Sequence, residues 1–229
     1  MTVATASYPI ENSLNAKRSV VDTVSQTSSI VREVLGQRRS VKQFDAEVKI
    51  SDIDLQDIIK AASSAPSAFN IQHWRVVQIK DRDIKQQLHT LAWKQPQILT
   101  ASELLVICMD VRAWDKEELP FCHAPNQEAK DKFKSMLTNI YANNYQLQRD
   151  EAQRSASLFS MSLMLQAQAK GYQTCPMSGF DYYKVGKLLK LPPNIEICML
   201  VALGKESEGS EKTRKTRVAA DHFVKINTF

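Results

Sequence analysis

The chain has 229 residues, of which 43% are hydrophobic and 24% charged, and its formal net charge is +5. This balance is typical of a globular protein and argues against a disordered chain, and no apolar run approaches the roughly 18 residues that cross a bilayer. Residues 1–10 lack the basic and apolar regions of a secretory signal. The four cysteines form no C-x-x-C pair, so we expect reduced thiols and a cytoplasmic protein with no membrane partner.

Several catalytic motifs are missing from the sequence. The six glycines build neither G-x-G-x-x-G nor a Walker loop, which argues against a Rossmann or P-loop nucleotide site. The four histidines are widely spaced and there is no G-x-S-x-G motif, so neither a metal site nor a serine hydrolase is expected. Any bound phosphate would therefore be held by side chains.

Hydrophobic spacing and turn residues predict the elements in chain order. Residues 1–25 are interpreted as an N-terminal extension and residues 26–229 as a single domain. The expected elements are helices over 28–35 and 52–64, a strand over 75–79, helices over 81–93 and 97–103, a strand over 104–109, helices over 127–148, 155–170 and 181–190, and a strand over 196–203. This order predicts an α+β fold with four or five strands.

Local signals refine three of these segments. Ser51 is a candidate N-cap for the helix over 52–64, with Asp54 three residues later, and Pro66 ends that helix. The segment 111–126 has mixed charge, two prolines and no period, so we expect a mobile excursion. The helix over 155–170 is apolar on nearly all sides, which is typical of a helix buried in a core or a subunit interface.

Two basic segments contain the groups of an anion site. Arg38–Lys42 offers guanidinium, hydroxyl and ammonium groups within five residues, and Lys215–Arg217 repeats this set near the C-terminus. The intervening turn over 65–74 is rich in amides and hydroxyls that suit the polar edge of a planar heterocycle. Taken singly, such basic runs are more often solvated surface or tail. Neither has the interleaved aromatic residues of a single-strand-binding surface.

Five segments in this order resemble the nitroreductase family of flavoproteins over about residues 30–229. The matching segments are residues 38–44, the turn over 65–74, residues 95–98, residues 177–181, and Gly204 followed by Lys215-Thr216-Arg217. Each segment is weak evidence alone, and their common order carries the resemblance. The chain departs from the family pattern at His73, Lys94 and Ser178, where proline, asparagine and glutamate are common.

The resemblance implies a nitroreductase-like α+β fold, with a mixed, mainly antiparallel sheet flanked by helices, in an interlocked homodimer that binds FMN at its interface. It also implies the cofactor contacts: Arg38, Ser40 and Arg217 on the phosphate with Arg39 and Lys215 beside them, Lys42 at the N1 and C2 carbonyl side, Gln97 at the pyrimidine end, Ser178 and Gly179 at the N5 edge, and Pro66, Ser67 and Asn70 from the partner subunit.

The implied function is hydride transfer from NAD(P)H to the flavin, followed by reduction of a nitroaromatic, a quinone or another conjugated acceptor in a ping-pong sequence. The cofactor carries this chemistry, so no catalytic side chain is assigned, and the segment 111–126 is expected to choose the acceptor. The alternatives are a specialised reductase of an activated alkene or a halogenated substrate, a flavin-binding protein without turnover, and a basic nucleic-acid-binding domain. The favoured interpretation includes no nucleic-acid partner.

Overall fold

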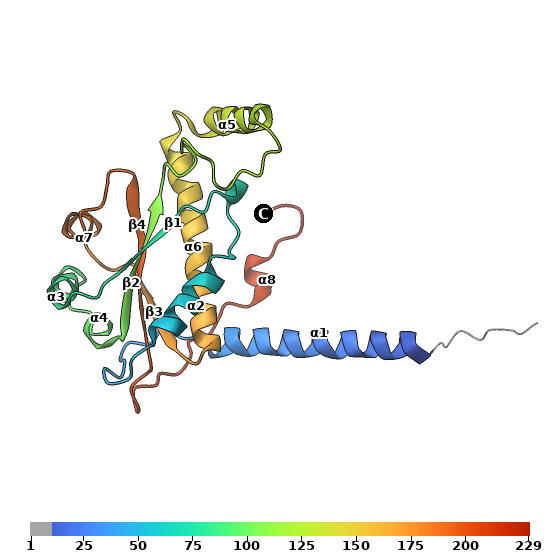
Figure 1. Cartoon of the computed structure of the whole chain (residues 1–229). Helices are drawn as coiled ribbons and strands as arrows, with labels where there is room; N and C mark the ends of the chain where they lie inside the picture. The colour runs from blue at the N-terminus through green and yellow to red at the C-terminus, as the bar shows by residue number, and fades with distance from the viewer. Residues whose placement is uncertain (1–10) are drawn as a thin grey trace, which may run out of the picture. The chain divides into compact units, whose positions relative to one another are not determined.

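The computed structural model describes residues 11–229, so the first ten residues of the predicted extension lie outside it (Figure 1). The chain divides into one unit that ends at Arg38 and another that runs from Arg39 to Phe229. The first unit contains α1 (Glu11–Gln37), so the helix predicted over 28–35 is too short. Serine, threonine, valine and asparagine are weak helix formers, which explains why the sequence pattern missed the helix over 11–25. Within residues 11–229, no helix is long and apolar enough to cross a membrane.

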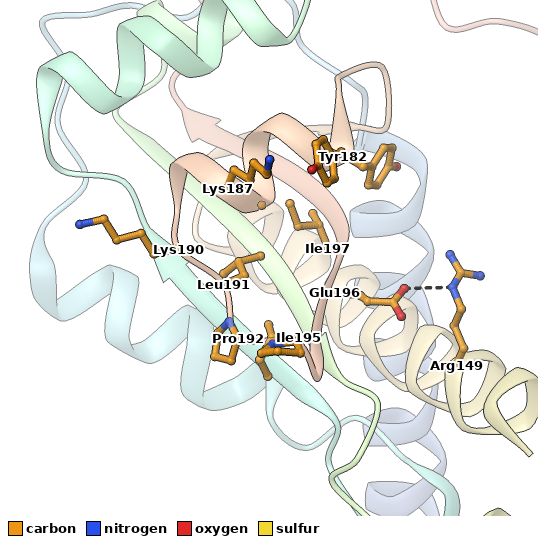
Figure 2. Close-up of a pocket in the computed structure, with 12 residues that line it drawn as sticks. Arg149, Tyr182, Lys187, Lys190, Leu191, Pro192, Ile195, Glu196 and Ile197 are labelled. Carbon is orange, nitrogen blue, oxygen red and sulfur yellow. Dashed lines mark hydrogen bonds and ion pairs between the residues drawn. The ribbon is translucent and has the colours of Figure 1, made fainter. Parts of the chain in front are cut away.

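The second unit is built on a four-stranded sheet in the order β1-β2-β4-β3, with all neighbouring strands antiparallel. The strands are β1 (Trp74–Gln78), β2 (Glu103–Asp110), β3 (Gln173–Met177) and β4 (Ile195–Gly204). The three predicted strands are confirmed, whereas β3 was not predicted. β3 is an edge strand, which is where Pro176 is tolerated. It pairs with β4 no further than Leu200, and the start of β4 borders a cleft instead (Figure 2).

Helices cover both faces of this sheet (Figure 1). The helices of the second unit are α2 (Asp52–Ala62), α3 (Arg82–Leu91), α4 (Gln97–Thr100), α5 (Gln127–Tyr141), α6 (Tyr145–Ala169), α7 (Tyr182–Leu188) and α8 (Ala220–Phe223). α2 and α6 pack on one face, and α3, α4 and α7 pack on the other. Leu105 and Ile107 of β2 face the first layer and Leu104 and Val106 face the second, which is why this strand is a continuous apolar run.

The helix predicted over 127–148 is wrong as a single element. Asn143 adopts a left-handed conformation with φ 63°, and the Asn144 side chain accepts a hydrogen bond from the N–H of Leu147 at the start of α6. Asparagine tolerates both roles better than most residues. The chain therefore breaks between α5 and α6, and α6 extends well before the predicted start at 155.

The segment 111–126 has neither helix nor strand, as predicted. It is nevertheless packed, because Trp114 and Phe121 are buried against Leu137 and Tyr141 of α5. Since these side chains form a small core of their own, the position of the segment is set by burial at several points along its length.

Candidate functional site

The segment that follows Arg38 lies along the free edge of β3. Ser40 forms a parallel bridge with Thr174, and the Val41 N–H donates to the Thr174 carbonyl at 3.1 Å. This pairing places Lys42 beside Cys175, with 3.4 Å between Nζ and Sγ. Two segments that are far apart in sequence therefore bring a cation to the middle of β3.

Two glutamines connect Cys175 to the end of β3. Gln95 Nε2 donates to the Gly179 carbonyl at 2.8 Å, and Gln97 Nε2 donates to Gln95 Oε1 at 3.0 Å and lies 3.7 Å from Cys175 Sγ. A carbonyl oxygen only accepts, so Gln95 must turn its nitrogen to Gly179 and its oxygen to Gln97. The result is a continuous chain of contacts from Lys42 to Gly179, in which Cys175 Sγ accepts from both Lys42 and Gln97.

This chain joins three of the predicted cofactor residues, namely Lys42, Gln97 and Gly179. The two residues that connect them, Gln95 and Cys175, were not among the predicted contacts. Gln95 lies inside the matched segment 95–98, so that match was the available signal. Nothing local marked Cys175, because its role depends on β3 and the segment at Lys42 lying side by side.

Two details fit a planar ligand with polar edges, such as a flavin. Gln97 is fully buried, and its Oε1 has no hydrogen-bond partner among the described residues. A buried acceptor without a donor costs about 1–3 kcal/mol, so this carbonyl suits a ligand N–H. A Cβ on Gly179 would lie 2.8 Å from Trp93 Cζ3, so a larger residue here would displace the Trp93 ring. The donor of Lys42 and the acceptor of Gln97 match the mixed edge of a pyrimidine ring.

The predicted phosphate residues are only partly brought together. Arg39 Nη2 pairs with Glu206 at 3.0 Å and Nη1 donates to the Lys212 carbonyl at 2.6 Å, so this guanidinium holds the start of the C-terminal tail. Ser40 is exposed beside β3. Lys215 and Arg217 lie in the exposed tail, where Arg217 Nη1 donates to the Lys215 carbonyl at 3.2 Å. Arg38 belongs to the first unit, where its N–H donates to the Val34 carbonyl.

The turn that carries Pro66, Ser67 and Asn70 is tightly folded on itself. Ser67 Oγ accepts from the Gln72 N–H at 3.0 Å. Phe69, Asn70 and Gln72 have φ values of 52°, 58° and 56°. Residues other than glycine rarely adopt this left-handed backbone conformation. Such strain is found where function fixes the backbone, and the predicted rigid turn therefore remains a candidate for ligand contact.

His73 ends this turn and points into the protein. It is fully buried, its Nδ1 lies 3.0 Å from Ser155 Oγ of α6, and its carbonyl accepts from the Asp110 N–H. Burial lowers the pKa of His73 to about 4, against an opposing effect of the Asp110 charge. His73 is therefore neutral near pH 7 and connects the turn to α6 as a structural residue.

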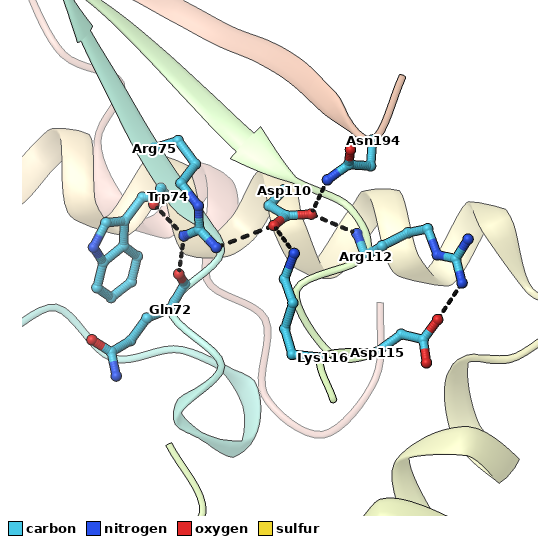
Figure 3. A network of polar contacts seen from close by, with 8 residues as sticks. All are labelled: Gln72, Trp74, Arg75, Asp110, Arg112, Asp115, Lys116 and Asn194. Carbon is cyan, nitrogen blue, oxygen red and sulfur yellow. Dashed lines mark hydrogen bonds and ion pairs between the residues drawn. The ribbon is translucent and has the colours of Figure 1, made fainter. Parts of the chain in front are cut away.

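A polar network holds the start of the segment 111–126 (Figure 3). The Asp110 carboxylate, 2% exposed, accepts from Arg75 Nη2 at 3.1 Å, Lys116 Nζ at 2.9 Å and Asn194 Nδ2 at 2.8 Å. Burial alone would raise the pKa of Asp110, but the hydrogen bonds from Asn194 and Lys116 and the charges of Lys116 and Arg75 hold it below its ordinary value. This carboxylate is a structural anchor.

An aromatic pocket of about 360 Å³ lies between the strained turn and the segment 111–126. Phe69, Phe121 and Phe133 line it, together with Cys122 and His123. The rings of Phe69 and Phe121 each form a T-shaped pair with the Phe133 ring, at centroid distances of 6.2 and 6.4 Å. The pocket can take a flat apolar or aromatic molecule.

The comparisons with known sequences agree on one family. The model described as the Nitroreductase family matches residues 35–205. Protein DrgA from Synechocystis sp. is 38% identical over 184 residues, which cover 80% of this chain and 88% of that protein. An oxygen-insensitive NADPH nitroreductase from Helicobacter pylori is 30% identical over 200 residues, which cover 82% of this chain and 94% of that protein.

Solved structures show the same likeness. A protein from Exiguobacterium sibiricum that is classed with the nitroreductases, in complex with FMN, has a TM-score of 0.74 and 27% identity, covering 85% of this chain and 95% of that chain. The enone reductase CLA-ER has a TM-score of 0.76 and 28% identity, covering 86% of this chain and 98% of that chain. The likeness to these two structures extends over most of each chain.

Proposed function

The chain belongs to the nitroreductase family, and on that premise we propose that it takes a hydride from NAD(P)H and reduces nitroaromatic, quinone or similar conjugated acceptors. It is an NAD(P)H-dependent flavin oxidoreductase, and its cofactor is FMN. The observation that carries the proposal is the chain of contacts from Lys42 to Gly179, because it joins three predicted flavin contacts and leaves the Gln97 carbonyl without a donor.

Bound FMN supplies hydride and electron transfer. The protein supplies position and charge. We propose that Lys42 faces the N1 and C2 carbonyl side, where its positive charge favours the reduced, anionic ring and so raises the reduction potential. Gln97 receives the pyrimidine edge, and Ser178 and Gly179 lie at the N5 edge.

The phosphate contacts in the proposal come from Arg38, Ser40 and Arg217, with Lys215 beside them. Arg39 acts differently from these four, since its guanidinium is engaged by Glu206 and Lys212. Its contribution is to hold the tail so that Lys215 and Arg217, which follow within five residues of Lys212, stay near Ser40.

The exposed C-terminal tail supports a homodimer. No residue from 211 to 229 is buried. The large apolar side chains exposed there are Val218, Phe223, Val224, Ile226 and Phe229. Such a run is stabilised by covering it with another surface, and we propose that a second copy of this chain does so. Pro66, Ser67 and Asn70 of each copy then line the flavin of the other.

The aromatic pocket beside the segment 111–126 is the proposed acceptor site. Phe69 lies between Ser67 and Asn70, so the pocket adjoins the turn that we assign to the flavin of the partner. Phe121 of the segment 111–126 lines the pocket, which supports the proposal that this segment chooses the acceptor. Donor and acceptor use the same flavin in turn, as in a ping-pong reaction. We propose that the protein works in the cytoplasm, where its free cysteine thiols stay reduced.

The visible spectrum of the purified protein, followed anaerobically during additions of NADH and then NADPH, tests this function. We expect bound flavin that bleaches with at least one donor and recovers its colour with a nitroaromatic or a quinone. A yellow protein that neither donor bleaches would be a flavin-binding protein without turnover. A colourless protein that ignores added FMN, and binds nucleic acid with a steep salt dependence, would contradict the proposal altogether.

A second candidate function is reduction of an activated alkene, favoured by the likeness to the enone reductase. The same flavin chemistry serves both reactions, so the acceptor decides between them. Recovery of the bleached protein should be measured with an α,β-unsaturated ketone and with a nitroaromatic at equal concentrations. A much faster recovery with the ketone would favour this second function.

A further inference from the structure

A cleft of about 760 Å³ lies beyond the end of β3 (Figure 2), and its lining includes none of the residues predicted to bind FMN. Its walls come from α7 and the loop after it, from the start of β4 and from Arg149 of α6. Leu191, Ile195 and Ile197 supply apolar surface. The volume lies within the range of about 300–1,000 Å³ that is usual for small-molecule sites.

The cleft carries more positive than negative charge. Its lining contains Arg149, Lys187 and Lys190, and a single carboxylate, that of Glu196. Arg149 Nε donates to one oxygen of Glu196 at 3.0 Å, and the Tyr145 hydroxyl donates to the other. Because the carboxylate is already compensated, the two lysines leave a positive potential that attracts anions.

Aromatic rings accompany these lysines. Tyr182 and Tyr183 are 43% and 69% exposed, and Lys187 Nζ lies 4.4 Å from the centroid of the Tyr183 ring. Tyr182 packs on Phe180 with 4.0 Å between ring centroids, which fixes its position. Ammonium groups beside exposed aromatic rings suit a ligand that combines phosphate with a planar base.

The cleft lies close to the proposed N5 edge of the flavin. Tyr182 follows Gly179 by three residues, so their Cα atoms are at most about 11 Å apart. A second cavity also contains basic residues, Arg112 and Lys116, but these pair with Asp115 and Asp110. The α7 cleft is the better match for an anion.

We propose that this cleft binds the ADP portion of the pyridine nucleotide while the nicotinamide lies at Gly179. Lys187 and Lys190 attract the diphosphate, and Tyr182 and Tyr183 contact the adenosine. The inference rests on the proposed function, because it assigns a site to the donor of that reaction. It adds four residues of α7 and the following loop to the donor site.

The test compares NADH with reduced nicotinamide mononucleotide, which carries the same hydride but has no ADP portion. The variants are Lys187→Ala, Lys187→Ala/Lys190→Ala and Tyr183→Ala in the FMN-loaded protein. Lys184→Ala is the matched control, because Lys184 is on the same helix but pairs with Asp181 and does not line the cleft. Calorimetric binding of ADP-ribose to the same proteins gives a second measurement that does not depend on turnover.

We expect KM for NADH and Kd for ADP-ribose to rise roughly threefold for Lys187→Ala and tenfold for the double variant. KM for the mononucleotide should stay the same in every variant, and the control should match the unchanged protein for both donors. Equal KM values for NADH in all variants would overturn the proposal, and so would equal increases for both donors. If the unchanged protein binds FMN but neither donor bleaches it, the proposed function itself has failed.

Discussion

Two polar clusters at the sheet differ in how completely their atoms are paired. Asp110 is 2% exposed and its carboxylate accepts hydrogen bonds from Arg75, Lys116 and Asn194. Gln97 is fully buried, and its carbonyl oxygen has no partner among the described residues. Both groups are polar and buried, but only the second has a hydrogen-bonding need that the protein itself leaves unmet.

This difference separates a structural cluster from a candidate binding cluster. A carboxylate with its donors in place stabilises the fold and has no capacity for a ligand. An orphaned carbonyl destabilises the free protein and is compensated only when a donor arrives. We therefore expect changes at Asp110 to affect folding and changes at Gln97 to affect FMN, and four experiments test that separation.

The largest expected effect follows Asp110→Ala. The change leaves Arg75, Lys116 and Asn194 without their shared acceptor, so the free energy of unfolding should fall by about 3 kcal/mol. Chemical denaturation measures this loss. Asp115→Ala, which removes a partly exposed partner of Arg112, is the control and should cost less than about 0.5 kcal/mol. The folded fraction of the Asp110 variant should still bind FMN with unchanged affinity, and a loss of FMN would contradict the separation.

Lowering the pH should reduce the free energy of unfolding, because His73 is buried in its neutral form. Its pKa is about 4 in the folded protein and about 6.5 in an unfolded chain, so the folded state binds fewer protons between these values. Stability is therefore fully present above pH 6.5 and falls as the pH drops toward 4. The free energy of unfolding should decrease by roughly 2 kcal/mol between pH 7 and 4.5. In His73→Gln most of this decrease should disappear, and an unaltered decrease would assign it to other groups.

A smaller effect is expected at the tail. Arg217→Ala removes a proposed charged contact to the FMN phosphate, at a cost of about 1.5 kcal/mol, or roughly a tenfold weaker affinity. Fluorescence titration of the FMN-free protein with FMN measures it. Lys225→Ala changes a charge in the same tail, where Lys225 donates to the Asp221 carbonyl, and should leave the affinity alone. Full retention of FMN by the Arg217 variant would refute the phosphate assignment.

The smallest effect, and the sharpest test of the comparison, is expected from Gln97→Leu. The substitution removes a buried acceptor that has no donor, and this gain offsets the loss of the hydrogen bond that Gln97 donates to Gln95. The FMN-free protein should therefore keep its stability within about 1 kcal/mol. The FMN affinity should fall by about fivefold and the flavin potential should shift. Gln148→Leu is a matched control, since Gln148 donates a side-chain hydrogen bond to the Tyr141 carbonyl at 2.7 Å and is not a predicted flavin contact. Equal flavin behaviour in both variants would remove Gln97 from the site.

Much of the fold could be predicted because its signals are local. Ser51, Asp81 and Asp181 each accept a hydrogen bond from the backbone at the start of a helix, and such caps act over three residues. The strand over 104–109 was predicted from its continuous apolar run, which is typical of a strand that is buried on both faces. The errors fall where tertiary contacts override local preference. β3 was not predicted because it contains Pro176, a residue that is rare in strands. The single helix over 127–148 was wrong because the chain breaks at Asn143, within an apolar spacing that would otherwise suit one helix.

The candidate site was predictable only in part for the same reason. Lys42, Gln97 and Gly179 stand in segments that match a family pattern. Cys175 contacts Lys42 and Gln97 across 133 and 78 residues of sequence, and Gln95 contacts Gly179 across 84 residues. No local pattern encodes such contacts. Asp54 shows the converse. It has the spacing of a capping-box partner, yet its carboxylate accepts hydrogen bonds from Lys170 and Tyr172, which lie just beyond the C-terminal end of α6.

The exposed tail over 211–229 has a consequence for how the protein behaves in dilute solution. If the tail is covered by a second copy and Arg217 holds the phosphate, as proposed, association and FMN binding are linked equilibria. Dilution would then separate the subunits and release FMN together. The yellow colour per molecule would depend on protein concentration, and added FMN would hold the dimer together at concentrations where the colourless protein is monomeric.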